Sequence, residues 1–497
     1  MELILFLSAL ILFFFMALKI LKKSNPIRLP SGPKTLPIIG NMHQLFGPLP
    51  HHILWDLAKQ YGPLMHLKLG EISTFIVSSP EIAKEIMNEH DIIFASRPSL
   101  LGPKILNYNC SDIAFSPYGD YWRYLRKICT VELLTPRRVQ TFRSIREEEV
   151  LKMIKSISEN DQSVVNLSKL IFPLTYKITA KAAFGKRNKY HEDFEAVVED
   201  VVKLMGAFNI ADMFPSFKLL EVISGRKQKL EKTHKKIDGI MENIIKEHKE
   251  KRKNSHNEEE EEKEDLVDVL LNIQESGDLM TDNSMKAVIY DVFSAGGETS
   301  STTVEWTMSE MIKNPRVMKR AQEEVRKVFD ERGNVDESNL QELKYLQAVI
   351  KESMRLHPAA PLLLPRECRE QCKIIGYDIP INARVLVNAW ALGRDPRHWT
   401  EPEKFIPERF LDSGIDFRGK DFSYIPFGAG RRMCPGISFA LANVELPLAQ
   451  LLYHFDWKLP GELKLEELDM EESFGLTVRR KKDLLLIPIS YACSSVK

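Results

Sequence analysis

The distribution of apolar residues along the chain predicts a protein built mainly from α-helices. Apolar positions recur at helical spacing through several long stretches, which is the main sequence signal for a helix. Short strand-like runs are fewer, so we expect a mainly α fold with a minor β-sheet. The predicted helices span residues 144–157, 194–205, 229–251, 284–313, 340–356 and 437–455, and the predicted strands span residues 64–69, 74–78, 373–375 and 384–388.

The N-terminus is far more apolar than the rest of the chain. Residues 3–18 carry no charge, and a group of lysines follows them. A helix over residues 3–21 would be roughly 28 Å long, about the hydrocarbon thickness of an endoplasmic reticulum membrane. A cleaved signal peptide is the alternative, but it normally has a basic start and a small-residue cleavage site. We therefore expect residues 1–24 to be an uncleaved transmembrane anchor, with the lysines keeping the body of the protein in the cytosol.

A proline-rich segment follows the apolar run. Four prolines within residues 25–40 exclude a helix there and indicate an extended, semi-rigid spacer. No internal repeat or second break in composition follows, so residues 41–497 are expected to form one domain. Within it, residues 249–265 are almost entirely charged, which favours a solvated mobile loop over a partner-binding acidic tail.

Composition and charge narrow the possible functions. Basic and acidic residues number 69 each, so net charge gives no argument for nucleic-acid binding. Six cysteines in 497 residues are too few for a disulfide framework, which favours a reducing compartment.

The residues around Cys434 carry the clearest chemical signal. The sequence Phe427-Gly-Ala-Gly-Arg-Arg-Met-Cys434-Pro-Gly436 forms a constrained loop before the predicted helix 437–455, which Pro447 should kink. Free backbone N–H groups at a helix N-terminus favour a thiolate. A lone thiolate in such a loop suits the axial position of a haem iron, whereas zinc would need further Cys or His ligands nearby. A small buried structural cysteine is the alternative.

Three further motifs are ambiguous by themselves. Glu352 and Arg355 are one helical turn apart, as in many surface ion pairs. The sequence Ala295-Gly-Gly-Glu-Thr-Ser300 places two glycines in the longest apolar helix, at a cost of about 1 kcal/mol each. Either close packing or a ligand groove would explain that cost. Trp122 and Arg126 are donors that can hold a carboxylate, but they also fit a core tryptophan and a surface arginine.

Together these motifs resemble those of the cytochrome P-450 superfamily. Its signature Phe-x-x-Gly-x-Arg-x-Cys-x-Gly is matched by Phe427, Gly430, Arg432, Cys434 and Gly436. The resemblance runs through the whole chain and looks closest to plant microsomal members that include terpene oxidases. It implies the cytochrome P-450 fold and a haem b (iron protoporphyrin IX) with Cys434 as the axial thiolate.

The resemblance also implies roles for the other motifs. Phe427 and Gly436 belong to the haem-binding loop, and Glu298 and Thr299 form the acid–threonine pair that delivers protons to dioxygen. Many relatives have Asp at the position of Glu298. Four donors are expected at the two haem propionates: Trp122, Arg126, Arg366 and Arg432. A buried structural network is expected from Glu352, Arg355 and Arg409.

The implied activity is insertion of one oxygen atom from dioxygen into a lipophilic plant specialised metabolite, with a terpenoid as the expected class. Electrons would come from an NADPH-cytochrome reductase, and the protein would be a single-pass membrane protein of the endoplasmic reticulum with a cytosolic catalytic domain. Mostly aliphatic and aromatic segments are expected to line the pocket. These are residues 101–115, 208–214, 288–295, 359–364 and 474–477.

Two other functions fit parts of the pattern. A haem–thiolate isomerase or dehydratase would consume hydroperoxides without dioxygen or a reductase, and the intact Glu298–Thr299 pair argues against it. A non-catalytic haem- or lipid-binding membrane protein would have no use for that pair.

Overall fold

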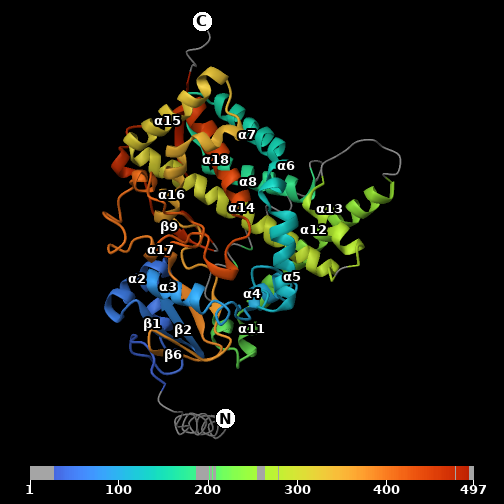
Figure 1. Ribbon diagram of the computed structural model, residues 1–497, viewed down its shortest axis with the longest axis vertical. Helices are drawn as coiled ribbons and strands as arrows, with labels where there is room; N and C mark the ends of the chain where they lie inside the picture. Colours follow the sequence, from blue (N-terminus) through green and yellow to red (C-terminus); the bar gives the residue numbers. More distant parts are fainter. Residues whose placement is uncertain are drawn as a thin grey trace, which may run out of the picture.

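The computed structural model describes residues 27–185, 209–254, 264–277, 279–475 and 477–491, together with residues 197, 201 and 204. Helices predominate, as predicted (Figure 1). They are α2 (Pro50–Tyr61), α3 (Pro80–Lys84), α4 (Leu101–Leu106), α5 (Asp120–Ile128), α6 (Pro136–Thr141), α7 (Arg143–Ser158), α8 (Ser168–Phe184), α10 (Ile210–Met213), α11 (Leu219–Ile223), α12 (Arg226–Asn254), α13 (Leu266–Glu275), α14 (Asp282–Lys313), α15 (Pro315–Phe329), α16 (Lys344–Leu356), α17 (Ala389–Leu392) and α18 (Ile437–His454).

The predicted helices are confirmed wherever the structure describes them. The predictions at 144–157, 229–251, 284–313, 340–356 and 437–455 correspond to α7, α12, α14, α16 and α18. The predicted helix 194–205 lies almost entirely outside the described residues. Helix α16 starts later than predicted because a 3₁₀ helix, Glu337–Glu342, precedes it, and α18 continues without a break through Pro447.

Proline sets where two of these helices end. The residue before a proline is disfavoured in the helical conformation. Helix α14 therefore ends at Lys313, since Pro315 follows Asn314, and α16 ends at Leu356 because Pro358 follows His357. Both Asn314 and His357 are non-helical.

The strands form several small sheets. The largest has the order β1-β2-β7-β4, in which β2 and β7 are parallel and the other pairs are antiparallel. A three-stranded sheet has the order β3-β11-β8, and β5–β6 and β9–β10 form two hairpins. The strands are β1 (Leu64–Leu69), β2 (Ile72–Val77), β3 (Val165–Asn166), β4 (Arg366–Glu367), β5 (Cys372–Ile374), β6 (Tyr377–Ile379), β7 (Arg384–Val387), β8 (Phe455–Lys458), β9 (Glu472–Phe474), β10 (Val478–Arg480) and β11 (Leu485–Ser490).

Helix α14 lies near the centre of the molecule and packs against α8, α16 and α18 (Figure 1). Gly297, the second of the two adjacent glycines, allows α14 to approach α8 closely. A Cβ atom on Gly297 would lie 2.4 Å from the Tyr176 ring. Only glycine fits at this crossing, so close packing accounts for one of the two glycines.

The charged segment at residues 249–265 is helical in its first part. Helix α12 extends to Asn254, so the prediction of a loop from residue 249 is wrong there. Contacts with neighbouring helices hold this turn: the Lys249 ammonium lies 3.3 Å from Asp282, and an Arg252 Nη2 donates to the Asp268 carbonyl at 2.5 Å.

The proline-rich segment is extended over residues 27–35, as predicted, but residues 36–40 form a tight turn in which Leu36 pairs with Gly40. The segment contacts the first strand. The His66 N–H donates to the Ser31 carbonyl at 3.1 Å, and Gly40 pairs with Leu69. The expected anchor, residues 1–24, lies outside the described residues. Among the residues that the structure does describe, no helix combines the length and apolar character needed to cross a membrane.

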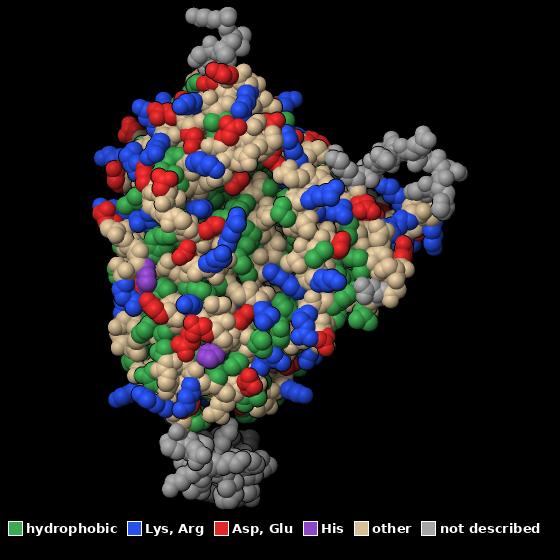
Figure 2. Space-filling model, in the orientation of Figure 1, with side chains coloured by type: hydrophobic (Ala, Val, Ile, Leu, Met, Phe, Trp, Pro, Cys, Tyr) green, Lys and Arg blue, Asp and Glu red, His purple; other side chains and the backbone are tan. Residues whose placement is uncertain are grey.

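The surface carries charges of both signs. In the view of Figure 2, Lys and Arg side chains alternate with Asp and Glu side chains over the face of the molecule. This agrees with the equal numbers of basic and acidic residues.

Candidate active site

Cys434 is partly buried in the loop directly before α18 and lines a cavity. Its N–H donates to the Phe427 carbonyl at 3.0 Å, and its Sγ accepts the Gly436 N–H at 3.3 Å. Gly436 is the N-cap residue of α18, so the predicted helix N-terminus beside the thiol is confirmed. Burial raises the pKa of the Cys434 thiol, whereas the Gly436 N–H and the Arg126 charge oppose that rise.

The shape of this loop depends on Gly430. Its φ is +69°, and a Cβ atom there would lie 2.1 Å from the Met87 carbonyl oxygen. Any side chain would therefore force the loop away from the segment that supports it.

The cavity that Cys434 lines is also lined by α14. Ala295, Gly296 and Thr299 contribute to its wall at the two-glycine sequence. A Cβ on Gly296 would lie 3.2 Å from Thr179 and 3.3 Å from Phe439. Close packing therefore explains Gly296 as well as Gly297, and Gly296 also contributes to the cavity wall.

The four predicted propionate donors all line this cavity. The Trp122 indole donates to the Ile113 carbonyl at 3.1 Å, and the Arg432 guanidinium lies 4.2 Å from the centre of the indole ring. An Arg126 Nη1 donates to the Met433 carbonyl at 2.6 Å, and an Arg366 Nη2 donates to the Ala429 carbonyl at 2.8 Å. These contacts hold the four side chains in the cavity wall.

Arg97 lines the same cavity, and the sequence analysis missed it. Its Nη1 donates to the carbonyls of Leu364 and Pro365, both at 2.8 Å. One feature of the sequence could have identified Arg97 as a candidate. It follows the mostly apolar run Phe94-Ala95-Ser96 and has no acidic residue within four positions to pair with. Such an arginine needs a partner from elsewhere in the fold or from a ligand.

Together the arginines form an electropositive cluster. Burial lowers the pKa of Arg97 well below its usual value, and the charges of Arg366 and Arg432 lower it further. Burial, followed by the charge of Arg366, lowers the pKa of Arg432 to about 9. A dianionic ligand would remove this repulsion. The arginine cluster and the Cys434 thiol in the wall of the same cavity fit a haem, whose propionates the arginines would hold and whose iron the thiolate would bind.

Thr299 and Glu298 are neighbours with different contacts. Thr299 Oγ1 donates to the Ala295 carbonyl at 2.7 Å. The buried Glu298 carboxylate accepts hydrogen bonds from Tyr176 at 2.8 Å and from Thr477 at 2.5 Å, and it pairs with Arg479. Glu298 therefore joins α14 to the segment around β10.

The predicted structural network around Glu352 is confirmed. Arg355 donates to the Glu352 carboxylate through Nε at 2.7 Å and Nη2 at 2.8 Å, and Arg409 Nε lies 3.0 Å from the same carboxylate. Glu352 and Arg355 are almost fully buried. Glu352 and Arg355 are therefore not a surface ion pair, which was the alternative interpretation of their spacing in the sequence.

All five predicted pocket segments contribute to this cavity or to a second one that adjoins it. The two share Phe115, Ala360, Leu363 and Leu364. Of the predicted residues, Phe208 and Leu476 lie outside the described parts of the chain.

Some charged side chains also line the two largely apolar cavities. The first cavity includes Asp291, and the second includes Asp212, Arg226 and Arg384. Asp291 lies on α14, and its Oδ2 accepts the Ile113 N–H at 2.9 Å.

Comparison with known proteins agrees with this geometry. A family model described as Cytochrome P450 matches residues 30–487. The chain is 59% identical to tabersonine 6,7-epoxidase isoform 1 of Catharanthus roseus over 100% of both chains, and 59% identical to tabersonine 16-hydroxylase 2 of the same plant over 98% of both. It is 50% identical to premnaspirodiene oxygenase of Hyoscyamus muticus over 97% of both.

Solved structures agree as well. A zebrafish cytochrome P450 solved with abiraterone matches with a TM-score of 0.74 and 25% identity, over 89% of this chain and 100% of that one. The family match covers most of the chain, and the similar proteins named above include hydroxylases and epoxidases. This chain belongs to the cytochrome P450 family of haem–thiolate monooxygenases.

Proposed function

We propose that this protein uses an NADPH-cytochrome reductase and dioxygen to oxidise a lipophilic plant specialised metabolite with a terpenoid scaffold. The observation that carries the proposal is one cavity that brings together the Cys434 thiol, the Thr299 hydroxyl and mostly apolar walls. When bound, the haem supplies the activation of dioxygen.

The residues of the chain hold that group and position the substrate. Cys434 would provide the thiolate that binds the haem iron, and Phe427 and Gly436 shape the loop around it. The propionates would be held by the predicted donors and by Arg97. These donors are Trp122, Arg97, Arg126, Arg366 and Arg432.

Glu298 and Thr299 provide the proton path. The Thr299 hydroxyl proton bonds to the Ala295 carbonyl, so the oxygen lone pairs are free to hold a water molecule in the cavity. Glu298 is buried, but its partner Arg479 is partly exposed. The pair thus reaches from the cavity wall to the surface. The Arg479 guanidinium keeps its own protons and holds the Glu298 carboxylate in place, so the protons would be resupplied by water.

Residues 1–24 are proposed to anchor the protein in the endoplasmic reticulum membrane, with residues 25–40 as the linker and residues 41–497 as the cytosolic catalytic domain. The charge-free run and the lysines after it support this arrangement.

The substrate class is tested by turnover in yeast microsomes that contain the protein and a reductase. A panel of terpenes is supplied with NADPH, and the products are identified. Tabersonine belongs in the panel, because enzymes named for it share more identity with this chain than premnaspirodiene oxygenase does. A product with one added oxygen atom that requires NADPH supports the proposal. Hydroperoxide conversion without NADPH would support the isomerase instead.

The assignment of Cys434 is tested by the spectrum of the reduced, carbon monoxide-bound protein. A strongly donating thiolate produces a red-shifted Soret band, and a neutral imidazole does not. Cys434→His should abolish that band, whereas Cys110→Ser should leave it unchanged. Loss of the band in the second variant alone would overturn the assignment.

A further inference from the structure

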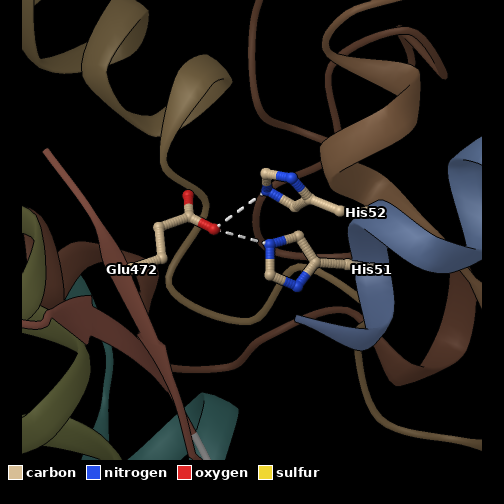
Figure 3. Close-up of side chains that lie close together, drawn as sticks. All are labelled: His51, His52 and Glu472. Carbon is tan, nitrogen blue, oxygen red and sulfur yellow. Dashed lines mark hydrogen bonds and ion pairs between the residues drawn. The ribbon is translucent and has the colours of Figure 1, made fainter. Parts of the chain in front are cut away.

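Three side chains outside the cavity converge on one point between α2 and β9. His51 Nε2 and His52 Nε2 lie 2.7 Å and 3.1 Å from the same oxygen of Glu472, Oε2 (Figure 3). All three donor atoms lie within 4.8 Å of one another. Glu472 and the histidines are about 420 positions apart in the sequence, so the fold alone brings them together.

The convergence of two adjacent helical residues is unusual. Side chains at neighbouring positions of a helix point about 100° apart and do not normally face the same partner. The site is also held rigidly. The His51 carbonyl accepts a hydrogen bond from the Asn388 amide at 2.8 Å, and the His52 ring lies 4.1 Å from Trp390.

We propose that His51, His52 and Glu472 bind a Zn²⁺ ion. Two imidazole nitrogens and one carboxylate oxygen are a ligand set that zinc takes in proteins, with a fourth position left for water. Zinc ligands at about 2.0–2.1 Å lie about 3.3 Å apart in a tetrahedral site. The observed separations of 2.7 Å and 3.1 Å need only small side-chain adjustments to reach that value.

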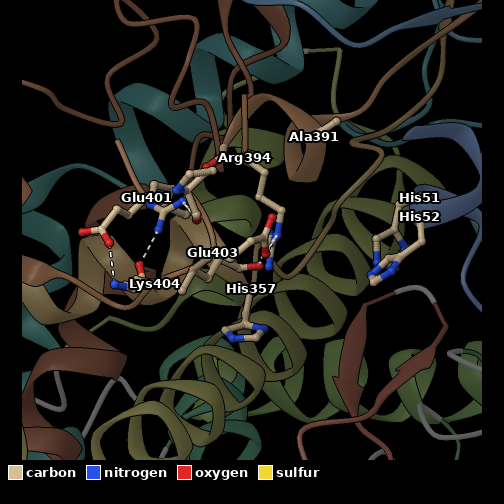
Figure 4. A network of polar contacts seen from close by, with 12 residues as sticks. His51, His52, His357, Ala391, Arg394, Glu401, Glu403 and Lys404 are labelled. Carbon is tan, nitrogen blue, oxygen red and sulfur yellow. Dashed lines mark hydrogen bonds and ion pairs between the residues drawn. The ribbon is translucent and has the colours of Figure 1, made fainter. Parts of the chain in front are cut away.

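A second layer of residues supports the proposed site. His357 Nδ1 lies 3.8 Å from the other Glu472 oxygen, Oε1, and His357 Nε2 lies 2.7 Å from Glu310 Oε1. Zinc-binding carboxylates are commonly hydrogen-bonded to an outer partner, and His357 Nδ1, which has no hydrogen bond among the described residues, is near enough to Oε1 to take that role after a small shift. The nearby Arg394 is paired with Glu403 at 3.2 Å, which balances its charge (Figure 4).

Solvent reaches the site from one side. The side chain of His52 is 40% exposed, whereas those of His51 and Glu472 are 0% and 8% exposed. A zinc ion can therefore enter beside His52 and bind to His51 and Glu472, which are already in position.

A second group with zinc-binding side chains contains His248, Asp265 and Asp268. Its carboxylates already have another role. They form the capping box of α13, in which the Asp268 N–H donates to Asp265 at 2.9 Å. Helix capping explains that group, and we assign no ion to it.

Zinc at the first group would affect the substrate cavity. Glu472 begins β9, and Phe474 and Gly475 after it line the second cavity. The ring of Phe474 stacks on His51 with centroids 6.1 Å apart. A bound ion would fix this hairpin against α2 and hold one wall of the cavity in place.

The test uses the full-length haem-containing protein without a histidine tag. Zinc binding is measured by competition with a fluorescent chelator after dialysis against EDTA. We expect one tight equivalent in the wild type, and at least about tenfold weaker binding in His52→Ala and Glu472→Gln. Added zinc should raise the midpoint of thermal unfolding of the wild type but not of these two variants.

His90→Ala and His248→Ala are the matched controls, and both should bind zinc as the wild type does. Haem content shows that each variant is folded, and the partly exposed His52 gives a decisive variant should Glu472→Gln fail to fold. Equal zinc binding in the wild type and His52→Ala, or loss of binding in His248→Ala, would overturn the proposal.

Discussion

Two carboxyl groups interact beside the candidate site: Asp291 lines the first cavity, and Asp112 is buried next to it. Asp112 and Asp291 are close together, and Asn107 Nδ2 donates to both, at 2.6 Å and 3.1 Å. Burial raises the pKa of both carboxyl groups, and the charge of Asp112 further raises that of Asp291. The pair therefore retains a proton at a pH at which exposed carboxyl groups have lost theirs.

The raised pKa values of Asp112 and Asp291 should make the free energy of unfolding depend on pH. Between the ordinary carboxyl pKa of about 4 and the raised values, the folded protein binds more protons than the unfolded chain. Its free energy of unfolding should then fall as the pH rises through that window. Asp112→Asn removes one of the two groups, so its unfolding midpoint should fall less than that of the wild type between pH 5 and pH 8. Asp56→Asn, which changes an exposed carboxylate, should follow the wild type, and an equal fall in all three proteins would contradict the coupling.

Substitution of Thr299 should uncouple NADPH consumption from product formation. Thr299→Ala keeps the cavity wall but removes the hydroxyl that we propose holds a water molecule. Haem content and substrate binding should be retained, while product per NADPH consumed falls and hydrogen peroxide rises. General acid–base groups typically contribute 10²–10⁴-fold to rates, so the loss in coupling should be easily measurable. Unchanged coupling would place the proton path elsewhere, for example at Ser300.

At the scale of secondary-structure elements, the close crossing of α14 and α8 depends on the absence of a side chain at Gly297. Gly297→Ala would place a methyl group against the Tyr176 ring, and overpacking typically costs about 1–3 kcal/mol. Gly296→Ala is the matched control, because its methyl group would meet neighbours no closer than 3.2 Å. We expect the unfolding midpoint to fall clearly for Gly297→Ala and less for Gly296→Ala. The reverse order would show that the contacts with Thr179 and Phe439 limit the packing more than the contact with Tyr176.

The network that joins α16 to the loop around Arg409 should be essential for folding. Removing one partner of a buried ion pair typically costs about 3–5 kcal/mol, a large part of a protein's stability. Glu352→Ala should therefore yield little haem-containing protein. Lys404→Ala breaks an exposed pair with Glu401 nearby and should yield normal amounts (Figure 4). Normal haem content in Glu352→Ala would contradict a structural role.

Long elements were predictable from the sequence, and their ends less so. Helical periodicity identified α7, α12, α14, α16 and α18 because each buries an apolar face over several turns. It did not place the last turn of α12, where charged residues look like a loop until α13 provides partners for them. The two-glycine sequence could not be interpreted from the sequence alone, since its partners Tyr176 and Phe439 are distant in the chain.

In the candidate site, too, features that depend on residues distant in the sequence were not predictable. Cys434 was predictable, because its loop and the following helix are local in sequence. Arg97 was missed, because its role depends on contacts with residues 364 and 365. The bonds of Glu298 to Thr477 and Arg479 likewise depend on a segment about 180 positions away.

At the scale of the whole molecule, the N-terminus should determine where the protein is found. Removing residues 1–24 should move the protein largely from the membrane fraction to the soluble fraction, with haem binding retained. The charge-free run and its flanking lysines are the reason for this expectation. A cleaved N-terminus or luminal glycans on the full-length protein would contradict it.

The spread of the cavity donors along the chain also constrains the order of events during synthesis. They extend from Arg97 to Cys434, and the thiol that completes the set stands close to the C-terminus. A growing chain on the ribosome therefore has Arg97 and Arg126 long before it has Arg432 and the Cys434 thiol, which follow each other closely. We expect the cofactor to be captured only after nearly the whole polypeptide has emerged, so that the supply of haem at that moment limits how much protein matures.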